Sequence, residues 1–123
     1  MGKREVYKMI DSKAANFVTL AVKEELWSAI TVNGEFHGNH EAIAVLCEEI
    51  EETEDEFDTM NQTAETFLPI LWENIKRDSI EPENERQLHA IKSTALRVAH
   101  ECVQVAAMCD KWSLLISNEN EQA

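Results

Sequence analysis

The chain is poor in residues that interrupt regular structure, with three glycines and two prolines among its 123 residues. It also lacks the alternation of apolar and polar residues that marks β-strands, because its apolar residues recur every three or four positions. No apolar run is long enough to cross a membrane. No such run follows Lys3 and Arg4 either, so we expect no secretion signal and a cytoplasmic protein. These absences predict an all-α fold.

Cysteines and basic residues are also scarce. The three cysteines, Cys47, Cys102 and Cys109, lie in apolar helical patterns without paired spacing, which predicts reduced thiols in the core rather than disulfides. Eleven Lys and Arg stand against 24 Asp and Glu, so the formal net charge is −13. Because phosphate contacts need a basic surface, we expect no direct binding to nucleic acid or to an anionic membrane. A basic protein, or a metal that carries an anionic substrate, fits this charge better.

The apolar periodicity predicts long helices joined by short loops. We expect the first helix at about Glu5 to Thr31, ended by the Asn33-Gly34 pair. The second begins near Asn39 and runs on into Thr63 to Arg77 or breaks near Asn61. Its proline, Pro69, predicts a kink or a separate third helix.

The last helix is expected from about Pro82, a residue that suits a first helical turn, to Ile116. The chain is then a four- to five-helix bundle, with residues 1–117 as a single domain and residues 118–123 as a polar tail. The expected inward residues are, helix by helix, Val6, Ile10, Phe17, Leu20, Ala21, Trp27 and Ile30; Ile43, Leu46, Cys47, Ile50 and Phe57; and Leu88, Ile91, Ala95, Val98, Ala99, Cys102, Val105, Ala106, Cys109 and Trp112.

Acidic residues crowd the second helix between Glu48 and Asp58. Like charges three or four residues apart repel on a helix, and no lysine between Glu41 and Asp58 relieves them. Solvation, a basic partner or bound divalent cations could each offset this repulsion. Val45 lies within the acidic face, as though part of that face were covered. Carboxylate oxygens without soft ligands suit Mg²⁺ or Mn²⁺.

The last helix carries one further carboxylate, Glu101, in an otherwise apolar stretch. Glu101 could be a ligand of a metal site, or it could form a surface ion pair with Arg97, four residues earlier. Two histidines, His37 and His40, flank the start of the acidic helix. They could contact phosphate or base, or they could simply belong to the entry turn. No Cys/His spacing matches a zinc site.

The string Glu48-Glu49-Ile50-Glu51-Glu52 is an E-E-x-x-E signature, and Glu101 follows on a later helix. Together they resemble the MazG-like all-α nucleotide pyrophosphohydrolases. The flanking segments 36–46 and 95–108 resemble a MazG-like subgroup more closely. The resemblance covers a minority of the chain, about residues 33–58 and 95–108.

The resemblance implies that Glu48, Glu49, Glu52 and Glu101 bind Mg²⁺ and take part in catalysis. The implied reaction is hydrolysis of a nucleoside triphosphate to monophosphate and pyrophosphate. His37, His40 and Gln104 would then contact the substrate. The family has an aspartate where this chain has Gln104, so the resemblance implies weaker metal binding and reduced activity.

Two further expectations concern partners. The apolar arc of the last helix is wider than one neighbouring helix needs, so we expect a homodimer or higher oligomer. Its contact residues would be Val98, Val105, Met108 and Trp112. The alternative function is a non-catalytic acidic protein that docks on a basic, possibly nucleic-acid-binding, protein surface.

Overall fold

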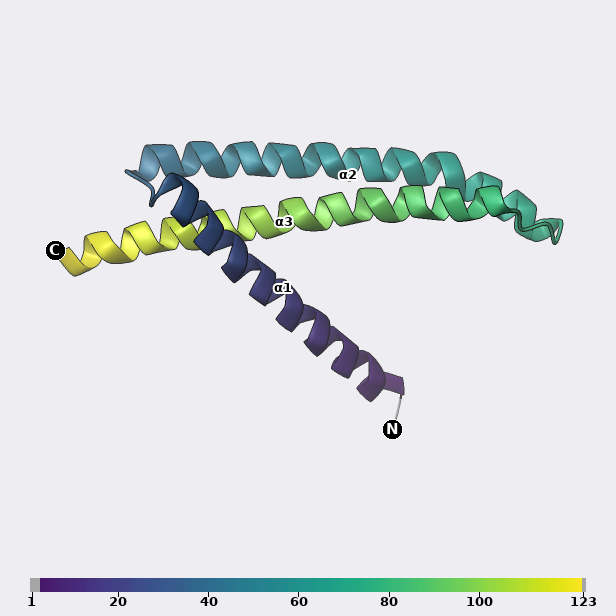
Figure 1. Ribbon diagram of the computed structural model, residues 1–123, viewed down its shortest axis with the longest axis horizontal. Coiled ribbons are helices and arrows are strands. Elements are labelled where there is room, and N and C mark those ends of the chain that lie inside the picture. The colour runs from purple at the N-terminus through teal and green to yellow at the C-terminus, as the bar shows by residue number, and fades with distance from the viewer. Residues whose placement is uncertain (1–2, 123) are drawn as a thin grey trace. The chain divides into compact units, whose positions relative to one another are not determined.

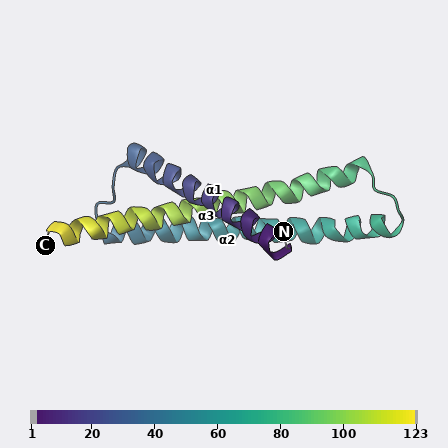
Figure 2. The same ribbon diagram turned by 90° about the horizontal axis from the view of Figure 1, so that it is seen from below.

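The computed structural model describes residues 3–122, which form three helices and no strand. Helix α1 spans Lys3–Asn33, α2 spans Asn39–Lys76 and α3 spans Pro82–Gln122 (Figure 1). Two short connections, 34–38 and 77–81, join them (Figure 2). Side chains are described from residue 12 to residue 121. The predicted all-α class is confirmed.

The predicted count of four to five helices is wrong, because α2 continues without a break through Asn61 and Pro69. A proline inside a helix removes one hydrogen bond from the ladder, and its ring crowds the carbonyl four residues earlier. The residues on both sides of Pro69 stay helical, and Leu71, two positions later, is buried. Packing of this stretch therefore outweighs the local preference of Pro69 to end a helix.

The helix ends follow local sequence signals. Gly34 adopts a φ of 72°, and its N–H donates to the Ile30 carbonyl at 2.7 Å, as expected for a left-handed cap after α1. The predicted starts of α2 at Asn39 and of α3 at Pro82 are confirmed. Helix α3 ends at Gln122 rather than at Ile116, so its polar last residues continue the helix.

The described chain forms two compact units. Within the described residues, the first unit comprises 3–47 and 103–122. Its core consists of Phe36, Ala42, Ala107 and Met108, against which α1 packs through Val22, Leu26 and Ala29. Lys111 is buried there, with its Nζ 4.3 Å from the centroid of the Phe36 ring. This contact and the burial of Phe36 anchor the 34–38 connection.

The second unit, residues 48–102, is a hairpin of the later part of α2 and the earlier part of α3. Its packed positions recur at intervals of three and four residues. On α2 they are Glu49, Thr53, Glu56, Met60, Thr63, Phe67, Leu71 and Asn74, and on α3 they are Asn84, Gln87, Ile91, Thr94, Val98 and Glu101. Half of these side chains or more are polar, so the seam of the hairpin is not a conventional apolar core.

The predicted inward stripes are partly wrong. Leu46, Ile91, Val98, Val105 and Trp112 are half-buried as expected. Other expected core residues are exposed, among them Phe17, Leu20, Trp27, Ile43, Ile50, Phe57, Leu88, Ala95, Ala99 and all three cysteines. The side chains of Val6 and Ile10 lie outside the described part of the chain.

The error on α2 arises because the packed face lies one residue before the predicted apolar stripe. Glu49 and Glu56 occupy the seam, whereas the more apolar Ile50 and Phe57 follow one position later, about 100° around the helix. A helix in a hairpin has one neighbour, and here that neighbour covers the more polar face. The predicted contact residues Val98, Val105, Met108 and Trp112 are half-buried or buried within the single chain.

A polar cluster closes the hairpin at the start of α3. Asn84, 2% exposed, accepts hydrogen bonds at its Oδ1 from the Glu81 N–H at 2.8 Å and from Asn74 Nδ2 at 3.0 Å. Its Nδ2 donates to Gln87 Oε1 at 3.0 Å. One buried amide thus caps the first turn of α3 and joins it to α2.

We expect Asn84→Ala to destabilise the protein by about 2–3 kcal/mol, because buried polar partners are left unsatisfied. Urea unfolding monitored by circular dichroism would measure this loss. The exposed neighbour Glu85 provides the matched control, and Glu85→Ala should change the unfolding free energy far less. A loss of equal size in both variants would contradict the role given to Asn84.

Candidate metal centre

Three carboxylates come together in the second unit. Glu49 and Glu52 on α2 and Glu101 on α3 each offer an oxygen within 4.8 Å of the others. Glu49 and Glu101 are half-buried, and Glu52 is exposed. The resemblance implies one metal site for these three residues and Glu48, and the structure brings oxygens of Glu49, Glu52 and Glu101 together without Glu48.

The fold holds two of these carboxylates at the seam rather than on an outer face. Glu49 is a packed position of α2, one turn before Thr53, whose hydroxyl donates to the Glu49 carbonyl at 2.8 Å. Glu101 follows the half-buried Val98 on α3 at the spacing of the packed positions. The two helices thus bring carboxylates into proximity from opposite sides of the hairpin.

The donor set suits a hard divalent cation. Oxygens bound to one octahedral Mg²⁺ lie roughly 3 Å apart when adjacent and roughly 4 Å apart when opposite. The three oxygens, which lie within 4.8 Å of one another, would therefore have to move closer together through side-chain rotation to share one cation. The group contains carboxylate oxygens and no thiol or imidazole. That composition favours Mg²⁺ or Mn²⁺ over softer metals.

The other predicted site residues lie elsewhere. Glu48 is exposed and is not part of this group, because it precedes the seam position Glu49 by one residue. Gln104 is half-buried and belongs to the first unit. His37 and His40 also belong to the first unit and are exposed.

A shallow pocket of about 300 Å³ adjoins the carboxylate group through Glu101. It is lined by Glu56, Ser93, Leu96, Arg97, His100 and Glu101. The sequence did not distinguish Arg97 from the other basic residues of the chain. Its spacing of four residues from Glu101 was the available signal, and the structure places both residues around one pocket.

His37 has a local partner at the entry to α2. Its Nδ1 lies 3.0 Å from Glu41 Oε2, and its backbone N–H donates to Glu41 Oε1 at 3.4 Å. The hydrogen bond with the His37 side chain is the main cause that lowers the pKa of the Glu41 carboxyl, and the charge of Lys111 contributes a smaller part. This arrangement resembles a capping box, in which an acidic third residue reaches back to a free N–H.

The lowered pKa of Glu41 makes a pH dependence predictable. A carboxyl with a depressed pKa in the folded state stabilises the protein when ionised, and this stabilisation is lost as the pH falls. We expect Glu41→Gln to lower the melting temperature at pH 7 and to change it little at about pH 3, below the ordinary Glu pKa. Glu35→Gln, which changes an exposed glutamate of the 34–38 connection, is the control. An equal effect of Glu41→Gln at both pH values would contradict this.

Within residues 3–122, no helix has a stretch long and apolar enough to cross a membrane. Comparison with family models, curated proteins and solved structures found no match for this chain. The features of this chain that indicate a function are therefore the geometry of the carboxylate group and the sequence resemblance.

Proposed function

We propose that this protein binds Mg²⁺ or Mn²⁺ through Glu49, Glu52 and Glu101 and hydrolyses a nucleoside triphosphate to monophosphate and pyrophosphate. The observation that supports this is the convergence of carboxylates from two helices, two of them half-buried. An ordinary solvated acidic face would not direct carboxylates into a helix seam. The resemblance to MazG-like enzymes supplies the reaction class.

In this proposal Glu49, Glu52 and Glu101 would hold the cation beside the neighbouring pocket, which Glu101 also lines. A bound divalent cation neutralises phosphate charge and lowers the pKa of a coordinated water. Arg97 and His100 line the pocket beside Glu101 and would bind phosphate oxygens there. Water would then add to the α-phosphorus while the bond to the oxygen bridging the α and β phosphates breaks, so that pyrophosphate leaves with that oxygen and the proton of the water passes to solvent.

Gln104 limits this activity. An amide carbonyl offers a neutral oxygen where a carboxylate would offer a charged one, so it binds a divalent cation less strongly. The proposal therefore includes a slow enzyme, or a nucleotide-binding protein with reduced activity. Glu48, His37 and His40 remain proposed contacts to the metal and substrate on the strength of the sequence resemblance alone.

A second candidate function has its own support. Between residues 48 and 58, the exposed acidic side chains are Glu48, Glu51, Glu52, Glu54, Asp55 and Asp58, and the whole chain carries a formal charge of −13. Such a surface suits docking on a basic protein by electrostatic steering. In that case the protein would be a non-catalytic interaction partner.

The deciding experiment is pyrophosphate release over a panel of ribo- and deoxyribonucleoside triphosphates, with Mg²⁺, Mn²⁺ or chelator. Release that requires the cation supports the enzyme. A folded protein that neither releases pyrophosphate nor binds any nucleotide by calorimetry would refute the proposal and favour the acidic docking protein.

A further inference from the structure

The end of the hairpin carries a group of large apolar side chains that the rest of the chain leaves uncovered. Those with exposed fractions between 53% and 65% are Leu68, Trp72, Ile75, Ile80 and Leu88. Together with the buried Leu71 they line an open groove of about 790 Å³, which we call the hairpin groove. Single exposed apolar residues are ordinary on a protein surface, whereas a contiguous group of them is a feature of binding surfaces.

The spacing of the lining residues gives the hairpin groove its length. On α2 they lie at i, i+4 and i+7, on one side of the helix, and are Leu68, Trp72 and Ile75. At the start of α3, Glu81, Glu85 and Leu88 repeat this spacing. Seven residues of helix correspond to about 10 Å, or two turns. The groove therefore matches two turns of another helix in length.

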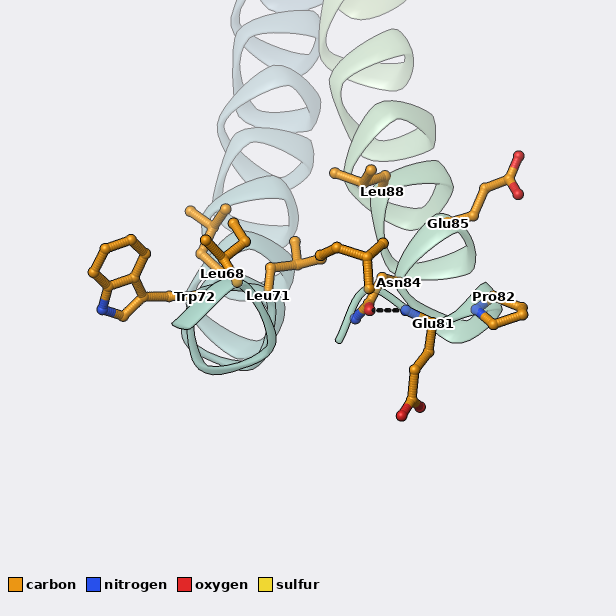
Figure 3. A pocket seen from close by; sticks show the side chains of 10 residues that line it. Leu68, Leu71, Trp72, Glu81, Pro82, Asn84, Glu85 and Leu88 are labelled. Atoms are coloured by element: carbon orange, nitrogen blue, oxygen red, sulfur yellow. Dashed lines mark hydrogen bonds between the residues drawn. The ribbon is translucent and has the colours of Figure 1, made fainter. Parts of the chain in front are cut away.

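The hairpin groove has an apolar floor and few polar groups. Figure 3 shows Leu71 pointing from α2 toward α3, with Trp72 and Glu85 at opposite edges of the view. The amide of Asn84 already accepts and donates hydrogen bonds within the hairpin. The polar groups that the groove offers to another molecule are therefore the exposed carboxylates of Glu81 and Glu85.

The charge of the hairpin groove is negative. Among the described residues that line it, Glu81 and Glu85 are acidic and none is Lys, Arg or His. On the neighbouring turn of α2, Lys76 Nζ pairs with Glu73 Oε1 at 2.6 Å, and on α3 His89 Nε2 lies 3.8 Å from Glu85 Oε1. An apolar floor with acidic side chains beside it complements a molecule that combines apolar and cationic groups.

We propose that the hairpin groove binds an amphipathic helix of a different protein, with apolar residues along one face and Lys or Arg beside them. In this mode of recognition the apolar side chains of the bound helix enter the groove. Its basic side chains pair with Glu81 and Glu85 at the start of α3. The groove is separate from the exposed acidic side chains of residues 48–58, and the proposal does not depend on catalysis.

Other occupants fit the hairpin groove less well. A second copy of this chain would bring Glu81 and Glu85 of both copies onto one apolar contact, and each copy carries a charge of −13. A pocket for a small molecule encloses most of its ligand, whereas this groove is open. Nucleic acid and anionic lipid would meet carboxylates rather than the basic groups that they need.

Fluorescence anisotropy with the full chain and a labelled peptide of Leu and Lys tests the proposal. The peptide has about 15 residues, with its leucines on one face, so that it can form a helix. We expect a micromolar dissociation constant. Replacing each Lys by Glu, or reordering the residues so that the leucines surround the helix, should weaken binding by at least about tenfold. Equal binding of all three peptides would overturn the proposal.

The double variant Ile75→Gln with Leu88→Gln removes apolar side chains from the hairpin groove and should weaken peptide binding by at least about tenfold. Ile50→Gln with Phe57→Gln is the matched control, because these side chains are 41% and 47% exposed on the same hairpin but do not line the groove. The control should bind as the wild type does. Equal weakening in both variants would overturn the proposal.

A second pair of variants tests the charges. Glu81→Gln with Glu85→Gln should weaken peptide binding and reduce its dependence on salt. Glu51→Gln with Asp55→Asn removes the same charge from exposed positions outside the groove, and this control should change binding little. If the control weakens binding as much, the peptide binds the acidic stretch of residues 48–58 instead, and the assignment to the groove is wrong.

The fluorescence of Trp72 reports occupancy of the groove in the wild-type protein. Trp72 is 58% exposed, so a bound peptide should shift its emission to shorter wavelength, and Trp72→Phe should remove that shift. Binding without the shift would contradict the proposal. Sedimentation equilibrium of the protein alone completes the test. Self-association that the variant Ile75→Gln with Leu88→Gln abolishes would identify a second copy as the occupant and overturn the proposal.

Discussion

Addition of Mg²⁺ should raise the melting temperature of the wild-type protein by roughly 10 °C at a free concentration of 100 times its dissociation constant. The physical reason is that the proposed cation would bind the folded hairpin, where oxygens of Glu49, Glu52 and Glu101 converge, and not the unfolded chain. Binding at that excess stabilises the folded state by about 2.7 kcal/mol. Differential scanning fluorimetry with Mg²⁺, Mn²⁺ and chelator would measure the shift.

The double variant Glu49→Gln with Glu52→Gln should melt higher than the wild type without metal, because two carboxylates no longer repel Glu101 and each other. It should also lose the response to Mg²⁺. Glu51→Gln with Asp55→Asn removes the same charge from exposed positions of α2 outside the group, and this control should respond as the wild type does. Melting curves that coincide in Mg²⁺, Mn²⁺ and chelator would show that the group binds no cation.

The second large effect is expected from Gln104→Asp. Position 104 follows Glu101 by three residues on α3, and residues three apart are neighbours on a helix surface. An added carboxylate should raise pyrophosphohydrolase activity roughly tenfold with Mg²⁺ or Mn²⁺, which corresponds to about 1.4 kcal/mol. Pyrophosphate release under saturating metal would measure this gain.

Adding Glu49→Gln to the Gln104→Asp variant is the control, and it should remove the gain. Strong activity in the wild type would instead mean that Gln104 is an adequate ligand or takes no part. An absence of activity and of nucleotide binding in both folded proteins would favour the acidic docking function.

The helix boundaries at Gly34, Asn39 and Pro82 were the most predictable part of the fold. Gly34, Asn39 and Pro82 act through their own backbone geometry or local hydrogen bonds, so the sequence around each is sufficient to place a boundary. Pro69 was not predictable in the same way. Whether the helix continues through Pro69 depends on the balance between packing along α2 and the cost of a proline inside a helix. That packing is set by residues far away in the sequence.

The choice of packed face was the least predictable. The periodicity of α2 favours Ile50 and Phe57 as inward residues, yet the seam uses Glu49 and Glu56. Periodicity reports that a face is apolar, but it does not report which neighbour covers it.

The members of the carboxylate group were predictable in part. Glu49, Glu52 and Glu101 were identified from an acidic string and an isolated carboxylate, because both patterns are visible within one helix each. Glu48 shares the acidic string but not the group, since neighbouring helix positions point about 100° apart. Arg97 was missed as a pocket residue because its distance from Glu56 depends on how the two helices align.

The position of the carboxylates on two different helices has a mechanical consequence. A cation held by Glu52 and Glu101 would cross-link the chain across a loop of roughly 50 residues, much as a disulfide does. Closing such a loop reduces the entropy of any state in which the hairpin opens. A bound cation would therefore hold the two helices of the hairpin together reversibly. Hydrogen exchange of the hairpin amides should slow as the fraction of protein with bound cation increases.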